Sequence, residues 1–320
     1  MSHGENHMLN EYKAHVDERA NQNIPPLPLD ADQTAHLVDL LKADHEESEL
    51  LLHLLKERVP AGVDQAAYVK AAFLSDITTG KADSPHVSKV DAVQILGTML
   101  GGYNIQPLIE CLKIDGLGSD AANALSKTLL IFDAFNEIFE LANTNEHAKR
   151  VIDSWAEGTW FTEKPEIPDQ IKLTVYKVPG EINTDDLSPA TDAWSRPDIP
   201  LHALAMFKMP REGIEKPLET IDELKEKGNP LVFVGDVVGT GSSRKSATNS
   251  VLWHMGDEIP CIPNKKEGGF CFGGKIAPIF FNTLEDSGAF PIELDVSNME
   301  MGQEIILEPH NGRVLDANTN

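Results

Sequence analysis

The segment GTGSSRKSATNS, residues 239–250, combines glycines, hydroxyls and cations in a way that suits an anion. It follows the apolar run LVFVGDVV, so it lies where a buried strand ends and a helix can begin. Glycines let the backbone approach a ligand closely, and the free N–H groups at a helix start attract negative charge. The segment therefore predicts an anion-binding turn, with Ser242, Ser243 and Arg244 nearest to the anion.

Two nucleotide-binding motifs fail at this turn. A P-loop needs Gly-Lys-Ser/Thr in succession, but Gly241 is followed by Ser-Ser-Arg. A dinucleotide-binding fingerprint needs a third glycine at position 244, which is arginine. A carboxylate fits better, because Arg244 can bind it through two parallel hydrogen bonds while hydroxyls and amides supply the remaining donors. The bare residues leave one alternative open, in which Ser242 or Ser243 only caps the following helix.

Two further segments carry polar residues of interest. The loop NTDDLSPATDAWSRPDIP, residues 183–200, offers Asp185, Asp186 and Arg196 as a polar wall, although Asp-Asp before Ser-Pro is also typical of ordinary turns. The apolar run IAPIFF, residues 276–281, indicates a buried strand, and we expect Lys275 beside it to be solvated rather than bound to an anion.

The cysteines and histidines predict no metal site. Cys111, Cys261 and Cys271 are far apart in the sequence and lack the C-x-x-C spacing of zinc or iron–sulfur sites. The histidines are scattered, with no H-x-x-x-H pair on a predicted helix. We expect inert, reduced thiols, which are typical of a cytoplasmic protein.

Composition sets further limits. The 320 residues suggest two domains, and their formal net charge of −24 disfavours broad binding to nucleic acid, which needs basic patches. An acidic surface also repels small anions, so a carboxylate site has to concentrate its arginines locally. No apolar stretch reaches membrane-spanning length, and the N-terminal residues MSHGENHMLNEYK do not form a signal peptide. We therefore expect a cytoplasmic protein that does not bind membranes.

The first half of the chain has helical periodicity. In residues 30–42, Leu37, Leu40 and Leu41 share one face, and Asp30 with Gln33 resembles a capping box. Further helices are indicated: one that stops at Pro60, one over 88–100 with Val90, Val93, Leu96 and Leu100 on its apolar face, and one over 105–113. Residues 119–143 indicate either one longer helix or a bent pair of helices. Short helices joined by tight turns predict stacked helical hairpins of the HEAT type.

The second half mixes strands, turns and helices. The polar, proline-containing segment 161–170 indicates a linker, and strands follow from the alternating run IKLTVYKV onward. We predict a helical domain over residues 1–164 and an α/β domain over 165–320. Asn311-Gly312 indicates a hairpin whose second strand has barely begun, so we expect the C-terminal end to be truncated.

Taken together, these stretches resemble the aconitase B family of bacterial hydro-lyases, whose members also serve as 2-methylisocitrate dehydratases. The resemblance covers essentially the whole chain and implies a HEAT-like domain followed by a swivel-type β/β/α domain. It is carried by VPAGVDQAAYVKAAFL, GTMLGGYNIQPLIECL and SKTLLIFDAF in the first half, and by GEINTDDLSPATDAWSRPDIPLHALAM, GDVVGTGSSRKSATNSVLW and GGKIAPIFFNTLEDSGAFPIELDVSNMEMG in the second.

The resemblance implies roles for individual residues. Ser242 matches the family's catalytic base, while Ser243 and Arg244 match groups that bind a carboxylate of citrate or isocitrate. Arg196 matches a second carboxylate clamp, and Asp185 matches an active-site aspartate that also contacts substrate. Asp186 stands where other branches of the superfamily have histidine.

The family also carries a four-iron, four-sulfur cluster, held by cysteines in a later part of a longer protein. That C-x-x-C pair does not occur here. We therefore expect this chain to bind no cluster, to need the missing cluster-bearing domains, and to be inactive alone. The alternative is a helical interaction module, in which residues 1–160 bind another protein or a second copy without catalysis. Binding to RNA is implied by the resemblance alone.

Overall fold

The chain forms two compact units in a computed structural model that describes residues 7–128, 134–163 and 165–318. The helical unit comprises Met1–Pro165 together with Pro260–Pro263, and the α/β unit comprises Glu166–Ile259 and Asn264–Asn320. A helical region followed by an α/β region is the predicted fold class, and it is confirmed.

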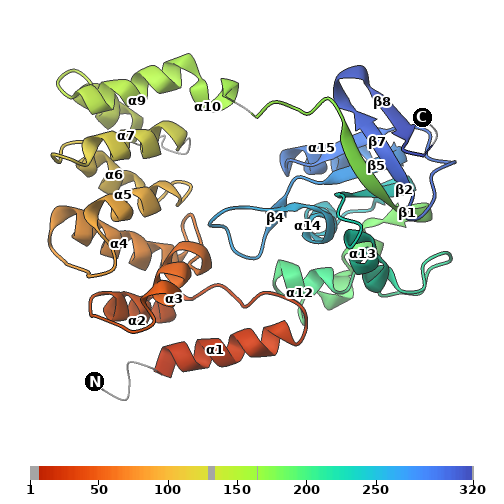
Figure 1. Ribbon diagram of the computed structural model, residues 1–320, viewed down its shortest axis with the longest axis horizontal. Coiled ribbons are helices and arrows are strands. Elements are labelled where there is room, and N and C mark those ends of the chain that lie inside the picture. Colours follow the sequence, from red (N-terminus) through yellow and green to blue (C-terminus); the bar gives the residue numbers. More distant parts are fainter. Residues whose placement is uncertain (1–6, 129–133, 164, 319–320) are drawn as a thin grey trace. The chain divides into compact units, whose positions relative to one another are not determined.

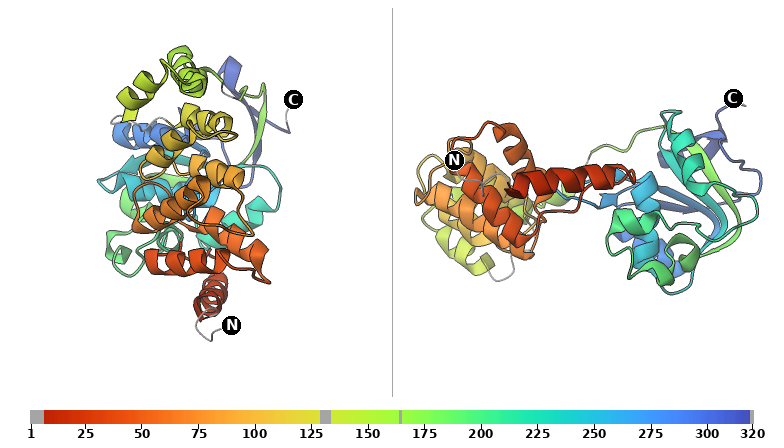
Figure 2. Two further views of the ribbon diagram at one scale, coloured as in Figure 1. Left: turned by 90° about the vertical axis from the view of Figure 1, so that its left-hand side faces the viewer. Right: turned by 90° about the horizontal axis from the view of Figure 1, so that it is seen from below.

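The helices of the first unit follow one another in chain order, from red to yellow-green in Figure 1 and again in the views of Figure 2. A short π-helical turn, Leu54–Arg58, continues α3 before the chain reaches Pro60. The helices are α1 (His7–Ala20), α2 (Ala31–Leu41), α3 (Ser48–His53), α4 (Gln65–Thr79), α5 (Lys89–Gly97), α6 (Ile105–Cys111), α7 (Gly118–Lys127), α8 (Phe135–Leu141), α9 (Glu146–Glu157) and α10 (Thr159–Thr162).

The helix starts agree with the capping residues of the sequence. Asp30 caps α2 in a complete capping box with Gln33, and Ser88 does the same for α5. The apolar face of α5 is shorter than predicted at both ends. Val93 and Leu96 are buried, but Val90 in the first turn is 39% exposed, and the helix ends at Gly97. Leu100 lies beyond it with φ of 64° and is 57% exposed.

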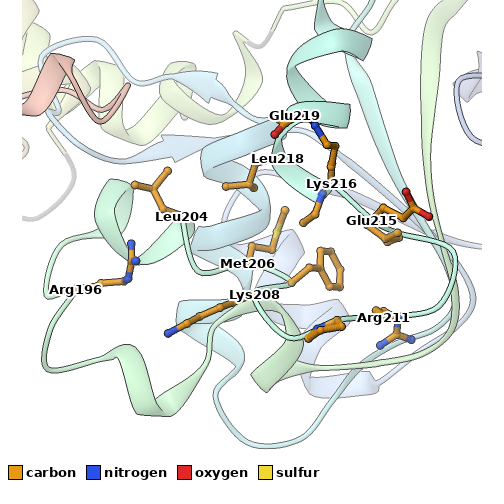
Figure 3. A pocket seen from close by; sticks show the side chains of 13 residues that line it. Arg196, Leu204, Met206, Lys208, Arg211, Glu215, Lys216, Leu218 and Glu219 are labelled. Carbon is orange, nitrogen blue, oxygen red and sulfur yellow. Dashed lines mark hydrogen bonds and ion pairs between the residues drawn. The ribbon is translucent and has the colours of Figure 1, made fainter.

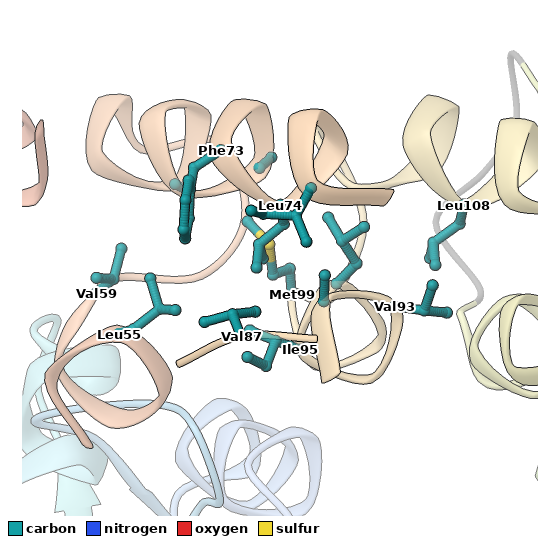
Figure 4. Close-up of a cluster of buried hydrophobic side chains, with 14 of the residues drawn as sticks. Leu55, Val59, Phe73, Leu74, Val87, Val93, Ile95, Met99 and Leu108 are labelled. Carbon is teal, nitrogen blue, oxygen red and sulfur yellow. The ribbon is translucent and has the colours of Figure 1, made fainter. Parts of the chain in front are cut away.

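Successive helices share one continuous core. Leucines 37, 40 and 41 of α2 are all buried in it, as predicted. Figure 4 shows part of this cluster, where Phe73 and Leu74 of α4 lie among side chains from the neighbouring helices and loops. Shared burial of this kind is how a stack of short helices gains its stability.

Within residues 119–143 the structure describes two helices, which agrees with the alternative of a pair rather than with one longer helix. α7 ends at Lys127, and α8 begins at Phe135. The prediction for 119–143 also covers residues 129–133, which lie outside the described residues.

The α/β unit is built on a six-stranded sheet of order β6-β5-β2-β1-β7-β8. The four strands β1, β2, β5 and β6 are parallel neighbours, while β7 runs antiparallel to β1, and β8 antiparallel to β7. The bounds are β1 (Ile171–Asn183), β2 (Leu231–Thr240), β5 (Phe270–Ile276), β6 (Phe290–Glu293), β7 (Glu304–Glu308) and β8 (Arg313–Asp316), with β3 (Asp257–Glu258) and β4 (Lys266–Glu267) forming a separate pair.

Strand β2 is buried on both faces, which explains its nearly unbroken apolar sequence. Leu231 and Phe233 belong to one core cluster, while Val232 and Val234 belong to another. Helices contribute to the first cluster, so they lie on that face of the sheet. The helices of this unit are α11 (Thr184–Leu187), α12 (Ile199–Ala203), α13 (Pro217–Lys225), α14 (Arg244–Met255) and α15 (Pro278–Asp286).

The prediction of a strand over residues 276–281 is wrong. Strand β5 ends at Ile276, and α15 begins at Pro278. Proline suits the first turn of a helix, because its missing N–H would have no partner there. Phe280 and Leu284, four residues apart, then bury the same face of the helix.

The C-terminal hairpin extends further than the sequence indicates. All four residues of β8 pair with β7, from Arg313 opposite Glu308 to Asp316 opposite Ile305. Its turn is the 3-10 segment Pro309–Asn311, followed by Gly312 with φ of 59°.

Gly239 near the end of β2 gives a test of this packing. Its φ is +81°, and a Cβ there would lie 2.2 Å from Cγ of Phe280. Gly228 has a nearly equal φ of +80° but no atom within 4 Å of an added Cβ. We expect Gly239→Ala to lower the free energy of unfolding by about 3 kcal/mol and Gly228→Ala by only about 1 kcal/mol, in urea denaturation. Equal losses would contradict the close approach to Phe280.

Candidate functional site

The two polar segments meet because β1 and β2 are parallel neighbours. Asn183, the last residue of β1, lies opposite Thr240, the last residue of β2. The loop that starts at residue 184 and the turn at residues 241–243 therefore leave the sheet at the same edge. The carboxyl ends of parallel strands are where ligands bind in open α/β sheets.

Thr184 joins these two segments directly. Its hydroxyl accepts a hydrogen bond from the backbone N–H of Ser243 at 3.2 Å, and the residue is only 1% exposed. Gly241 packs against the same hydroxyl, since a Cβ there would lie 2.5 Å from Oγ1 of Thr184 and the backbone φ is +108°. Glycine is thus required at 241 both for its conformation and for the close approach.

Neither serine side chain of the turn makes a capping hydrogen bond to the following helix. Ser243 is the N-cap residue of α14, but its side chain makes no capping hydrogen bond. Ser242 is exposed, and its hydroxyl has no hydrogen-bond partner among the described residues. Arg244 donates from Nη1 to the carbonyl oxygen of Gly241 at 3.2 Å, which holds the guanidinium beside the turn. A free hydroxyl, first-turn amides and a cation therefore lie together here.

The two aspartates of the loop have different surroundings. Asp185 is exposed, and its carboxylate has no partner within the part of the chain that the structure describes. Asp186 accepts a hydrogen bond from the backbone N–H of Asn183 at 2.8 Å and pairs with Nη1 of Arg211 at 3.0 Å. Asp186 therefore holds the loop in place, whereas Asp185 is available to a ligand.

Arg196 lies in the same loop as the two aspartates, ten residues after Asp186. It lines an open pocket of about 630 Å³, shown in Figure 3. Residues 197–199, which follow it, share a smaller pocket of about 140 Å³ with Ser246 and Asn249 of α14. This shared pocket brings residues 197–199 close to the first turns of α14. The pocket that Arg196 itself lines contains none of Asp185 and residues 242–244, so the structure does not bring Arg196 into contact with them.

The remaining sequence candidates have other roles. Lys275 is solvated as predicted, with its side chain 77% exposed and its Nζ 3.4 Å from Glu293. Thr184 and Asp192, the partner of Arg196, were missed. No local pattern distinguishes either residue, and only the folded chain places them against the candidate residues.

The cysteines do not fit an iron–sulfur cluster. Cys111 and Cys271 are buried in separate cores, and burial raises the pKa of both thiols, that of Cys271 to about 12. A cluster needs several thiolates in one place. No group of three or more His, Cys, Asp or Glu residues that could hold a metal ion occurs among the described residues. None of the described helices is long and apolar enough to cross a membrane.

Comparisons with known proteins identify the family. The family described as "Aconitate B N-terminal domain" matches residues 11–161, and "Aconitate hydratase 2 N-terminus" matches residues 173–320. The chain belongs to the aconitate hydratase B family. It is 59% identical to aconitate hydratase B of Pseudomonas aeruginosa over 96% of this chain and 36% of that protein. The same identity to the Escherichia coli relative covers 98% of this chain and 37% of that one.

The chain thus spans little more than a third of the length of these aconitate hydratase B relatives. Among solved structures, it is similar to 3-isopropylmalate dehydratase of Methanocaldococcus jannaschii, with a TM-score of 0.31 and 18% identity, over 46% of this chain and 80% of that one.

His254 ties α14, the helix that begins at the Ser-Ser-Arg turn, to α12. It lies in the last turn of α14, is 8% exposed, and its Nε2 hydrogen-bonds to the carbonyl oxygen of Ala203 in α12 at 3.0 Å. Burial lowers the pKa of His254 to about 4. The folded state therefore favours the neutral ring, with Nε2 as the donor.

This burial predicts a pH dependence of stability. The unfolded chain takes up a proton at His254 near pH 6.5 and the folded chain only near pH 4, so unfolding becomes easier as the pH falls between these values. We expect the free energy of unfolding to drop by up to about 3 kcal/mol over this window. His254→Gln keeps an N–H donor but cannot titrate, so its urea midpoint should fall less between pH 7 and pH 4. Identical pH profiles of the urea midpoint in the wild type and His254→Gln would contradict the assignment of this pH dependence to His254.

Proposed function

We propose that this chain forms one wall of the tricarboxylate site of an aconitate hydratase. The enzyme would interconvert citrate and isocitrate through cis-aconitate and would also dehydrate 2-methylisocitrate. The relatives bear the name aconitate hydratase B, and the chain matches them over nearly its whole length. The observation that carries the proposal is the meeting of residues 184–186 with the Gly-Ser-Ser-Arg turn at one edge of the sheet.

The substrates dictate the residue types. Citrate and isocitrate each carry three carboxylates, so a site for them needs several cationic and hydroxyl donors in fixed positions. Arg244 and Arg196 would each bind a carboxylate, since guanidinium groups match carboxylate geometry. Ser243 would donate a further hydrogen bond, and Asp185 would accept one from a substrate hydroxyl. The overall charge of −24 makes such local cations more necessary.

Ser242 would act as the base. It would remove a proton from the carbon next to a carboxylate, and the negative charge that develops on that carboxylate would be stabilised by fixed donors. A serine hydroxyl ionises only where positive charge and N–H groups stabilise the alkoxide. Two features support this role. The Ser242 hydroxyl has no other partner among the described residues, and Arg244 with the first-turn amides of α14 lies directly beside it.

The family resemblance implies a four-iron, four-sulfur cluster, and the cysteines of this chain do not fit one. We propose that the cluster is bound by residues outside this chain, together with the rest of the substrate site. The chain alone is then expected to be inactive.

Substitution of Ser242 tests the catalytic role. In the complete enzyme, Ser242→Ala should lower kcat at least about a hundredfold, because a positioned base contributes that much or more. KM should change little, since a missing base does not remove a carboxylate contact. Ser246→Ala is the matched control, because that hydroxyl already donates to the carbonyl oxygen of Ser243 and faces no proposed substrate group. Steady-state kinetics with isocitrate that show equal kcat in both variants would refute the assignment of Ser242.

Contacts through the helical unit remain predictions. Phe135 and Phe139 of α8 are stacked with ring centroids 6.0 Å apart and are 43% and 53% exposed, which suits a protein partner or a second copy. Sedimentation velocity of the purified chain would test association, and a single monomeric species would contradict a second copy. Nothing in the acidic composition favours RNA.

A further inference from the structure

Asp192 is a buried carboxylate that the proposed chemistry does not use. Its side chain is only 7% exposed, and it lies four residues before Arg196 in the loop that follows α11. A carboxylate removed from water is costly unless cations and hydrogen-bond donors surround it. The groups that surround the Asp192 carboxylate therefore indicate its role.

Two cations from different segments share this carboxylate. Nζ of Lys208 lies 2.8 Å from Oδ1 and 3.2 Å from Oδ2, and Nε of Arg196 lies 3.4 Å from Oδ1. Figure 3 shows Arg196 and Lys208 on the same side of the pocket. The hydrogen bond from Lys208 holds the pKa of Asp192 below its usual range, so the carboxylate is ionised at neutral pH.

Asp192 also fixes the backbone of Arg196. The N–H of Arg196 donates to the carbonyl oxygen of Asp192 at 2.9 Å, so both the main chain and the side chain of Arg196 are tied to this one residue. Nη1 of Arg196 donates to the carbonyl oxygen of Leu201 at 3.2 Å. Of the guanidinium nitrogens, Nη2 alone has neither a hydrogen bond nor an ion pair among the described residues, since Nε pairs with Asp192 and Nη1 donates to Leu201.

We propose that Asp192 is a positioning residue that orients Arg196 so that Nη2 stays free for a substrate carboxylate. This inference rests on the proposed function, in which Arg196 is a carboxylate clamp. Holding a long side chain in one conformation before binding reduces the entropy that the ligand would otherwise have to overcome. Lys208 supplies the second positive charge, so that Asp192 can orient Arg196 without neutralising the region.

The test is a double-mutant cycle between Asp192 and Arg196, read by titrating tricarballylate into the complete enzyme. Tricarballylate carries three carboxylates but no hydroxyl, so it reports binding without turnover. We expect Asp192→Asn to raise Kd about tenfold, within the range of coupling between residues of one network. In the Arg196→Ala background, the same substitution should change Kd by less than about twofold, because its effect acts through Arg196.

A matched control separates an effect on the position of Arg196 from a general loss of folding stability. Asp236 is another paired carboxylate of the α/β unit, with Lys177 at 2.9 Å and the N–H of Gly180 at 2.6 Å. Asp236→Asn should lower Tm but leave Kd unchanged. If Asp192→Asn does not fold, the variant Asp192→Asn/Lys208→Met avoids an unpaired cation and is compared with Lys208→Met alone.

The outcomes distinguish the positioning role of Asp192 from the carboxylate-binding role of Arg196. An unchanged Kd in Asp192→Asn, or an equal loss with and without Arg196, overturns the positioning role and leaves the proposed function standing. An unchanged Kd in Arg196→Ala overturns the clamp itself, and the positioning role falls with it. A loss in Asp192→Asn that disappears in the Arg196→Ala background supports both.

Discussion

The candidate site depends on how closely two strand ends approach each other. The N–H of Ser243 reaches the hydroxyl of Thr184, and Gly241 leaves no room for a side chain between them. The parallel pairing of β1 and β2 makes this approach possible, since it brings both connecting segments to one edge. A side chain at 241 would push the two segments apart and break the hydrogen bond between Ser243 and Thr184.

A second constraint is electrostatic. The chain carries an excess of 24 negative charges, yet the proposed substrates are anions. Within the loop, Asp186 and Asp192 are each bound to cations, Arg211 for the first and Lys208 with Arg196 for the second. Their charges are therefore compensated locally: Asp192 is shared between Arg196 and Lys208, and Arg244 is paired with no carboxylate among the described residues. At longer range, solvent and salt screen the remaining negative charge.

Much of this arrangement could be predicted from the sequence. Caps such as Asp30 and Ser88 act within three residues, so they can be identified without knowledge of the fold. The anion turn could be identified for the same reason, because glycines and hydroxyls at a strand end act locally. Residues 276–281 were mistaken for a strand, since a short apolar run fits a buried strand as well as the start of a buried helix. Pro278 was the signal that distinguishes the two.

The parts that could not be predicted depend on long-range contacts. Thr184 meets Ser243 across 59 residues, and Lys208 meets Asp192 across 16, so no local pattern marks either pair. The family resemblance assigned roles to Ser242, Arg244 and Arg196, but it did not reveal what holds them. Asp186 is an example. The resemblance gave it no clear role, whereas its pairing with Arg211 shows that it holds the loop in place.

The central claim is that the Ser-Ser-Arg turn binds a substrate carboxylate, and one titration tests it most directly. Arg244→Ala and Lys245→Ala remove neighbouring cations from the same helix turn, and Lys245 is exposed with no partner among the described residues. With tricarballylate and the complete enzyme, we expect Arg244→Ala to weaken binding by ten- to a hundredfold, as loss of a charge-assisted hydrogen bond should, at roughly 1.4 kcal/mol per tenfold. Lys245→Ala should have an effect of less than about threefold. Equal affinities in the wild type and Arg244→Ala would contradict the account.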